Sequence, residues 1–341
     1  MAEKGEESSK PVEKYEVVFD EATGLKHYPF PLEQVPRLHW DDPTADHLMT
    51  HEMPVVLTGT ELVEPALRWT LPYLEDNIGS SKHTVYISKT KKFLYFDDKK
   101  VNNVPDFREP MKKREWTFSK FVDELKGHID RTDEYLYYQD TLTDTVGTSI
   151  KHDFVHFNWR WLNDRKKRYN WGQLTTNLLL IGQPGNISPC HYDEQHNYFC
   201  QVMGEKRCML FSPSNFDKLY PFPVAHPCDR QTQVDFNNPD FEKFPNFRDV
   251  KGYECMVKPG EVLYIPMYWW HWIEGLPKGG ITISITFWYR SGPVPNKIQY
   301  PLNDQQKTAI TRNIEKMLHE ALQDPAEVAP LLRMIVEGRY I

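Results

Sequence analysis

The chain has 341 residues, of which 40% are apolar and 26% charged, and its formal net charge is −7. This composition excludes a wholly disordered protein, and the negative charge argues against binding nucleic acid mainly through phosphate contacts. The length fits about two domains, or equally one large domain with terminal additions. Aromatic residues reach 13%, including ten tryptophans, which favours an aromatic-lined core or pocket.

The sequence lacks the usual signals for membrane insertion and secretion. Its longest aliphatic run, residues 178–181, is far shorter than the roughly 20 residues of a membrane helix, and residues 1–16 contain no apolar segment typical of a signal peptide. Five cysteines occur, an odd number without a C-x-x-C pair. We therefore expect reduced, mostly buried thiols in a cytoplasmic or nuclear protein.

The first half of the chain alternates short predicted strands and helices. Residues 1–15 are polar and charged and predict a disordered tail, and the prolines of residues 29–36 predict an extended segment. The apolar residues of 70–78 and 117–128 have helical spacing. Three runs rich in β-branched and aromatic residues predict strands, namely residues 51–58, 84–88 and 92–96.

From Leu174 onward the pattern changes to many short β-type runs separated by Gly, Pro, Asn and Asp. Regularly spaced short strands of this kind are typical of a barrel or a sandwich. The predicted strands are residues 178–181, 191–202, 206–211, 260–265 and 281–289.

The chain ends in two predicted amphipathic helices. Residues 305–322 place apolar side chains on one helical stripe, and Asp324-Pro325-Ala326-Glu327 has the residues that open a second helix. Such a pair can fold back on the domain or pack against a second copy of itself. The pattern alone leaves these two possibilities equally open.

One stretch of the β-rich half carries candidate metal ligands. His191 and Asp193 are two residues apart, so on an extended chain both side chains point to the same face. A third ligand must come from elsewhere, and the best candidate is His271, which follows a Pro-Gly turn, a strand and a proline. Two histidines and one carboxylate leave positions open for a cosubstrate and O₂, as in non-haem Fe(II) oxygenases.

A lone His-x-Asp is common by chance, and the chain has 13 histidines. Most such histidines lie on the surface or form hydrogen bonds in the core. The order of features favours a metal site, because a His-x-Asp at a strand precedes the turn, strand, proline and His in an all-β half. That order predicts a double-stranded β-helix, or cupin-like, metal site.

The run from Tyr169 to Ile341 resembles the JmjC-type 2-oxoglutarate oxygenases, and within them the asparaginyl hydroxylases of the factor-inhibiting-HIF type. Weaker similarity extends upstream to about Pro54. The strings that carry the resemblance are long and collinear: Trp171-Gly-Gln-Leu-Thr, Asn177-Leu-Leu-Leu-Ile-Gly, His191-Tyr-Asp-Glu-Gln, His226-Pro-Cys-Asp-Arg-Gln, Leu263-Tyr-Ile-Pro-Met-Tyr-Trp-Trp-His, Gly280-Ile-Thr-Ile and Asn313-Ile-Glu-Lys-Met-Leu.

The resemblance implies a mainly β fold with flanking helices. A double-stranded β-helix domain would span residues 16–300, and a helical dimerisation segment residues 301–341. It also implies an enzyme that uses Fe(II), 2-oxoglutarate and O₂ to hydroxylate the Cβ of asparagine, releasing succinate and CO₂. The implied substrates are the transactivation segment of HIF-α and ankyrin-repeat proteins, and the implied assembly is a homodimer through an apolar stripe that includes Leu332.

The resemblance also assigns roles to individual residues. His191, Asp193 and His271 would bind the iron, and a further set would hold 2-oxoglutarate, comprising Lys206, Tyr137, Ser188, Asn197 and Thr286. Lys206 would bind the distal carboxylate through a charge-assisted contact. Arg230 and Gln231 would hydrogen-bond the primary amide of the target asparagine, in a groove also lined by Gln195, Tyr95 and Trp288.

Three positions depart from the family pattern. Thr286 stands where the family has an asparagine that helps hold the cosubstrate, so we expect weaker or differently angled binding of 2-oxoglutarate without loss of activity. Ser188 replaces a threonine. Trp272 replaces a histidine directly after His271, which we interpret as the loss of a histidine that binds no metal.

Two other functions fit the same features. One is a JmjC oxygenase that hydroxylates or demethylates lysine, which an acidic pocket or an aromatic cage would favour. The other is a scaffold that binds transcription factors without chemistry. An intact triad together with Lys206 argues against the scaffold.

Overall fold

The structure is a computed structural model that describes residues 15–128, 133–142, 146–293 and 298–337. The predicted disordered tail lies outside these residues, apart from its last position. None of the helices in the described ranges is long and apolar enough to cross a membrane.

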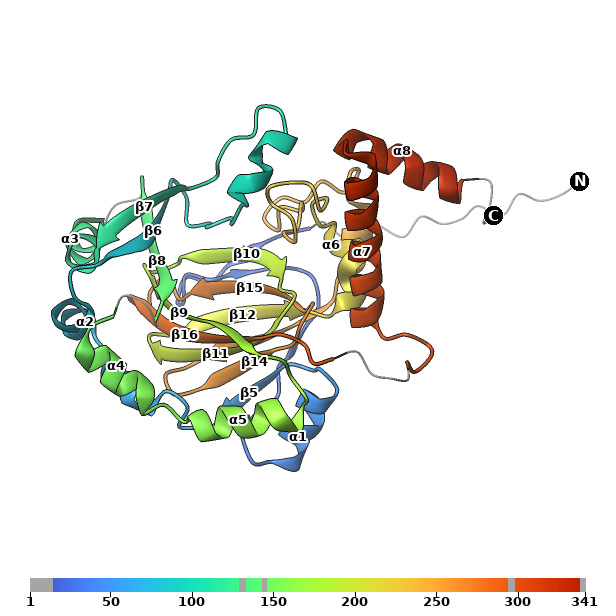
Figure 1. Ribbon diagram of the computed structural model, residues 1–341. Helices are drawn as coiled ribbons and strands as arrows, with labels where there is room; N and C mark the ends of the chain where they lie inside the picture. Colours follow the sequence, from blue (N-terminus) through green and yellow to red (C-terminus); the bar gives the residue numbers. More distant parts are fainter. Residues whose placement is uncertain (1–14, 129–132, 143–145, 294–297, 338–341) are drawn as a thin grey trace, which may run out of the picture.

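Two β-sheets form the centre of the molecule (Figure 1). The larger sheet has nine strands in the spatial order β4 (Arg37–His39), β5 (Val55–Thr58), β14 (Val262–Ile265), β11 (His196–Met203), β16 (Thr282–Tyr289), β9 (Leu174–Gly182), β8 (Tyr135–Thr141), β6 (Lys82–Ser88) and β7 (Lys112–Thr117). The smaller sheet has five, in the order β10 (Ile187–Tyr192), β15 (Trp270–Gly275), β12 (Lys206–Phe211), β13 (Gly252–Val257) and β3 (Leu32–Gln34). A separate hairpin joins β1 (Val18–Phe19) and β2 (Lys26–His27).

The strands of the two sheets alternate between an inner and an outer face. In β11, Phe199 points into a core shared by both sheets, whereas Tyr198 and Cys200 point outward. In β12, Leu210 points inward and Met209 outward. Successive side chains of a strand point to opposite faces, and here both faces are buried because each sheet is covered on both sides. The arrangement is the predicted double-stranded β-helix.

Helices cover the outer face of the larger sheet. The five that do so are α1 (Pro43–Thr50), α2 (Leu71–Ile78), α3 (Phe118–His128), α4 (Thr148–Val155) and α5 (Trp159–Arg168). Their apolar side chains, among them Phe121, Ile150 and Leu162, share one buried cluster with the outward residues of the sheet. The outer face of the smaller sheet is covered mainly by loop residues such as Phe236 and Phe247 and by Phe30.

The described ranges contain three further α-helices, α6 (Phe216–Leu219), α7 (Asp304–Leu322) and α8 (Pro325–Val336). In Figure 1, α7 and α8 lie at the opposite end of the molecule from α2 and α3. A capping box between Asn303 and Gln306 opens α7, and the Asp324 side chain caps α8 by accepting a hydrogen bond from the amide of Ala326. The predicted helix pair and the predicted start of α8 are thus confirmed.

Most predicted elements of the first half are also present, but the strand at residues 92–96 was wrong. Lys92 makes one isolated bridge to Ile187, and the chain then leaves the sheet. Phe93 is buried in the core between the two sheets. Its apolar character therefore reflects burial of single side chains and not pairing of a strand.

The run 191–202 is not one strand but two. β10 ends at Tyr192 and β11 begins at His196, so the chain turns at residues 193–195. All five cysteines are free and buried, as predicted.

Candidate metal centre and cosubstrate pocket

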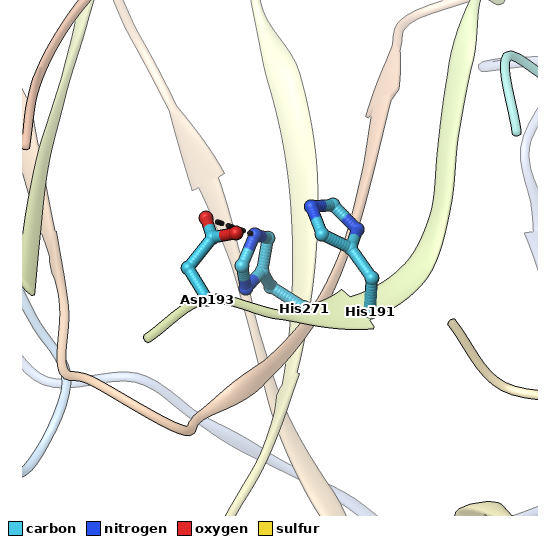
Figure 2. Close-up of side chains that lie close together, drawn as sticks. All are labelled: His191, Asp193 and His271. Atoms are coloured by element: carbon cyan, nitrogen blue, oxygen red, sulfur yellow. Dashed lines mark ion pairs between the residues drawn. The ribbon is translucent and has the colours of Figure 1, made fainter. Parts of the chain in front are cut away.

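The three predicted metal ligands converge at one end of the barrel (Figure 2). β10 pairs with β15 so that His191 lies directly opposite His271, and Asp193 follows in the turn after β10. One ligand atom from each residue lies within 4.8 Å of the others. The strand register therefore builds the triad from positions far apart in the chain.

Hydrogen bonds orient both imidazole rings. Nδ1 of His191 lies 2.7 Å from the carbonyl oxygen of Pro189, and Nδ1 of His271 lies 3.0 Å from that of Trp269. Since a carbonyl can only accept, each Nδ1 carries the proton and each Nε2 keeps a free lone pair. Nε2 of His271 lies 3.7 Å from Oδ2 of Asp193, the pair joined by the dashed line in Figure 2.

The protonation states also fit a divalent cation. Burial, together with the neighbouring His271, lowers the pKa of His191 to about 4, and burial lowers the pKa of His271. Burial alone would raise the pKa of Asp193, but the two histidines and Arg230 outweigh it, so the net pKa is lowered. Two neutral imidazoles and one carboxylate at neutral pH are the forms that bind a metal such as Fe(II).

Arg230 holds the other oxygen of the carboxylate. Its Nη1 donates to Oδ1 of Asp193 at 2.9 Å and to the carbonyl oxygen of Tyr192 at 3.2 Å. The backbone of Arg230 has φ of 70°, in the left-handed region that costs a non-glycine residue roughly 1 to 2 kcal/mol. The Arg230 side chain therefore extends from a strained loop to the triad, where it donates to the predicted metal ligand Asp193.

A cavity of about 440 Å³ opens from the triad into the barrel. Its lining includes most of the residues predicted for the cosubstrate and the substrate: Tyr95, Tyr137, Ser188, Asn197, Arg230, Gln231, Thr286 and Trp288. Of the remaining two, Lys206 lines a deeper chamber and Gln195 lines an adjoining polar cavity at the mouth. The structure thus brings every residue predicted for the metal, the cosubstrate and the substrate to adjoining cavities that share lining residues, whereas Leu332, predicted for the dimer, lies on α8.

Four polar atoms in the lining of this cavity are buried without a hydrogen-bond partner among the described residues. They are Oδ1 of Asn197, Oγ1 of Thr286, Oε1 of Gln231 and Nε1 of Trp288. Buried polar atoms are nearly always hydrogen-bonded in native proteins. Four exceptions around one cavity indicate a site built for a polar ligand.

Lys206 lies in the deeper chamber together with Tyr137 and Ser188. It is only 4% exposed, its Nζ lies 5.2 Å from the ring centre of Phe199, and no carboxylate in the described ranges forms an ion pair with it. Burial lowers its pKa to about 8. An unpaired buried cation is costly, and a carboxylate of a ligand would supply the missing counter-charge.

The same chamber contains two polar residues that the sequence analysis did not assign, Asn186 and Thr282. Oδ1 of Asn186 and Oγ1 of Thr282 have no hydrogen-bond partner in the part of the chain that the structure covers. Thr282 shares the strand parity of Thr286, and this alternation could have identified it. Asn186 gives no comparable signal, because it lies in the turn before β10.

The mouth of the cavity is formed by Tyr95 and Trp288. Tyr95 is 47% exposed, and Gln195 is held by the hydroxyl of Thr175, which donates to its Oε1 at 2.8 Å. Trp272 faces away from the metal centre, because it lies on the outer side of β15 and stacks on Phe236. A side chain at position 272 cannot reach the candidate metal site. This agrees with the interpretation that the histidine replaced by Trp272 binds no metal.

Comparison with known proteins places the chain in a family. Residues 43–294 match the cupin-like domain family. The chain belongs to this family. The cupin-like chain is 28% identical to lysine-specific demethylase 8 of Xenopus tropicalis, over 75% of this chain and 52% of the relative. It is also 28% identical to lysine-specific demethylase JMJ30 of Arabidopsis thaliana, over 69% and 49% of the two chains.

A third relative, tRNA wybutosine-synthesizing protein 5 of Gallus gallus, is 27% identical over 76% of the cupin-like chain and 78% of its own length. The chain spans about half the length of the two demethylases. The predicted relationship to the JmjC proteins is confirmed at the level of the family. The narrower resemblance to asparaginyl hydroxylases stays a prediction.

Proposed function

We propose that this protein is an Fe(II)- and 2-oxoglutarate-dependent oxygenase that hydroxylates a side chain of another protein. The observation that carries the proposal is a triad of oriented, correctly protonated ligands beside a buried lysine that has no ion-pair partner. When bound, Fe(II) and 2-oxoglutarate would supply the electrons that reduce and activate O₂, with the keto acid itself oxidised to succinate and CO₂.

The residues of the chain have separable tasks in this proposal. His191, Asp193 and His271 would hold the metal at the end of the cavity. Lys206 would bind the distal carboxylate of 2-oxoglutarate, with Tyr137 and Ser188 in reach of the same group. The unpartnered atoms of Asn197 and Thr286 would bind the end of the cosubstrate that lies near the metal.

For the acceptor, the geometry favours the primary amide of an asparagine. The unpartnered Oε1 of Gln231 can accept from the amide nitrogen, and the cation of Arg230 suits an amide oxygen. The acceptor Cβ would then lie near the triad, and hydroxylation would follow there. HIF-α-type transactivation segments and ankyrin-repeat proteins are the substrates we propose to test first.

Lysine is the second candidate acceptor, since two relatives bear the name of lysine-specific demethylases, and Tyr95 and Trp288 could contribute to an aromatic cage. A lysine or methyl-lysine cation would meet Arg230 at the cavity. Among the described residues, the only carboxylate lining this cavity is that of Asp193, which is already paired with Arg230. Like-charge repulsion therefore disfavours a cationic substrate.

Mass spectrometry of peptide products separates these candidates. The protein is incubated with Fe(II), 2-oxoglutarate and ascorbate, and with HIF-type, ankyrin and methylated histone-type peptides. We expect one added oxygen on an asparagine, and no product without 2-oxoglutarate. Addition of oxygen to lysine, or loss of methyl groups, would replace the first candidate by the second, and no product with any peptide would favour the transcription-factor-binding scaffold.

We further propose a homodimer through the C-terminal helices. Several apolar side chains of α7 and α8 are exposed, among them Met317 at 58% and Met334 at 68%, and Leu332 is only partly buried on α8. An apolar patch at a helix pair is a usual site of association. Light scattering of Leu332→Arg should give half the mass of the wild type; an unchanged mass would contradict the dimer. Location in cytoplasm and nucleus stays a prediction.

A further inference from the structure

Arg312 is a buried arginine on α7 that reaches both loops of the metal centre. It is 3% exposed and lies on the inward side of the helix. Its Nη1 and Nη2 donate to the two oxygens of Asp229 at 2.8 and 3.0 Å. Its Nε donates to Oε1 of Glu194 at 2.7 Å, and its Nη1 also donates to the hydroxyl of Tyr192 at 2.8 Å.

Each of these partners is a direct chain neighbour of a group at the metal centre. Tyr192 and Glu194 flank the metal ligand Asp193, and Asp229 precedes Arg230, which donates to Oδ1 of Asp193. One guanidinium therefore ties together the two loops whose side chains meet at the carboxylate. These loops come from positions more than 80 residues before Arg312 in the chain.

The loop that carries Arg230 needs such a tie. Its backbone at Arg230 has φ of 70°, and a strained conformation persists only where its surroundings enforce it. Local backbone hydrogen bonds contribute to holding this conformation. For example, the amide of Gln231 donates to the carbonyl of Cys228 at 3.1 Å. The bidentate contact from Arg312 adds a rigid fork that lysine could not reproduce.

We propose that Arg312 is a positioning residue for the metal centre, through which the docking of α7 sets the carboxylate of Asp193 and the guanidinium of Arg230. Without Arg312, Asp229 keeps only Lys100 as an ion-pair partner among the described residues, and Glu194 keeps only the exposed Lys316. Both loops then lose their common anchor. The inference rests on the metal centre of the proposed function and does not depend on the substrate.

The alternative is that Arg312 merely attaches α7 to the domain. A neighbouring residue on the same helix provides a matched control for this. Glu315 accepts a hydrogen bond from the amide of Val224 at 2.7 Å, so it also anchors α7, but this bond does not involve the neighbours of Asp193 or Arg230. Glu315→Ala removes this acceptor and should weaken the docking of α7 without removing any hydrogen bond to the chain neighbours of Asp193 and Arg230.

The test is a titration of the metal-free protein with Co(II), in which the visible absorption of the bound ion measures binding. We expect Arg312→Ala and Arg312→Lys to bind Co(II) about 10- to 100-fold more weakly, the usual effect of losing a group that orients a ligand. Glu315→Ala should keep the wild-type dissociation constant. Added guanidinium, well below denaturing concentration, should restore affinity in Arg312→Ala, whereas sodium chloride of equal ionic strength should not.

Wild-type Co(II) affinity in folded Arg312→Ala would overturn the proposal, and so would equal losses in Arg312→Ala and Glu315→Ala. If Arg312→Ala does not fold, Glu194→Gln decides the question, because its side chain is 38% exposed and its replacement conserves shape. Weaker Co(II) binding by that variant supports the proposal, and unchanged binding overturns it. Failure of the wild type to bind Co(II) would instead overturn the metal centre itself.

Discussion

The candidate metal ligands and the deep end of the cavity differ in how completely their polar groups are paired. At the metal end, both imidazoles donate to backbone carbonyls and the carboxylate of Asp193 accepts from Arg230. At the deep end, Lys206 has no ion-pair partner among the described residues, and Oδ1 of Asn186 and Oγ1 of Thr282 have no hydrogen-bond partner there. One end is arranged before anything binds, and the other is left open for a ligand.

This difference has a physical reason. A metal centre needs fixed geometry and fixed protonation, so its surroundings must be complete in advance. A pocket for an exchangeable organic anion must instead present free donors, and these raise the free energy of the unliganded protein. We therefore expect substitutions at the metal end to abolish function, and substitutions at the deep end to shift affinity and stability in opposite directions.

The largest effect is expected at the metal end. His271→Ala removes a ligand that nothing in the described structure can replace, so we expect turnover to fall at least about 100-fold, beyond the loss from a group that only orients a ligand. Co(II) titration measures the loss of metal binding, and mass spectrometry of the product measures the loss of turnover. Trp272→His is the matched control, because Trp272 lies next to His271 in the chain but points to the outer face of the sheet. Retained activity in His271→Ala would show that the triad is not needed for the reaction.

The next effect is expected at Lys206. Lys206→Met keeps the volume and removes the charge, and losing one partner of a buried charge pair costs roughly 2 to 5 kcal/mol, so KM for 2-oxoglutarate should rise about 100-fold. Because the pKa of the lysine is lowered from 10.5 to about 8, the buried charge destabilises the free protein by about 3 kcal/mol at neutral pH. The variant without ligand should therefore melt a few degrees higher.

A lower melting temperature together with an unchanged KM would contradict this view of the deep end. The penalty itself depends on pH. Because the folded pKa lies below the unfolded one, the unfolded chain binds more protons between about pH 8 and 10.5, so the penalty fades as pH rises through that window. The difference in melting temperature between wild type and Lys206→Met should shrink over the same range.

A smaller effect is expected from pH alone. Only protonated Lys206 supplies a charge for the distal carboxylate, and its pKa in the free protein is about 8. Above that pH, KM for 2-oxoglutarate should rise by up to about tenfold per unit. Steady-state kinetics from neutral to alkaline pH measure this slope. In Lys206→Met, KM should be high and flat across the range; a parallel rise in both proteins would assign the titration to another group.

The smallest effect is expected at Thr286. Asparagine at this position restores the amide of the family pattern, and one added hydrogen bond is worth about 1 kcal/mol, so KM for 2-oxoglutarate should fall about fivefold. Isothermal titration of the Co(II)-loaded protein measures the affinity directly. Thr286→Ala, which only removes an unpartnered hydroxyl, serves as control. An unchanged KM in Thr286→Asn would show that the cosubstrate does not reach this strand position.

Several features of the fold were predictable because local sequence specifies them. β12 has the predicted bounds of Lys206–Phe211, and α8 begins after the predicted Asp324 cap. The split between β10 and β11 was not predictable in this way, because the turn at residues 193–195 contains no glycine or proline. The false strand at residues 92–96 shows the same limit, since an apolar run does not reveal whether it pairs or packs.

For the site, the sequence determined the kinds of donor and their order along the chain. His191 and Asp193 share a face by simple alternation, His271 follows them in the predicted order, and residues 43–294 match the cupin-like domain family. The tertiary structure decided which groups surround these donors. Arg230 binds Asp193, Arg312 ties the loops, and Asn186 and Thr282 line the chamber of Lys206.

The physical reason is the range over which each kind of information acts. Period and capping depend on neighbours a few residues apart, so they can be read from the chain itself. The contacts of Arg312 join residues 83 and 118 positions apart, and such pairings exist only after two sheets and a C-terminal helix have packed. The sequence therefore supplied the ligands, and the packing supplied the geometry that lets them act.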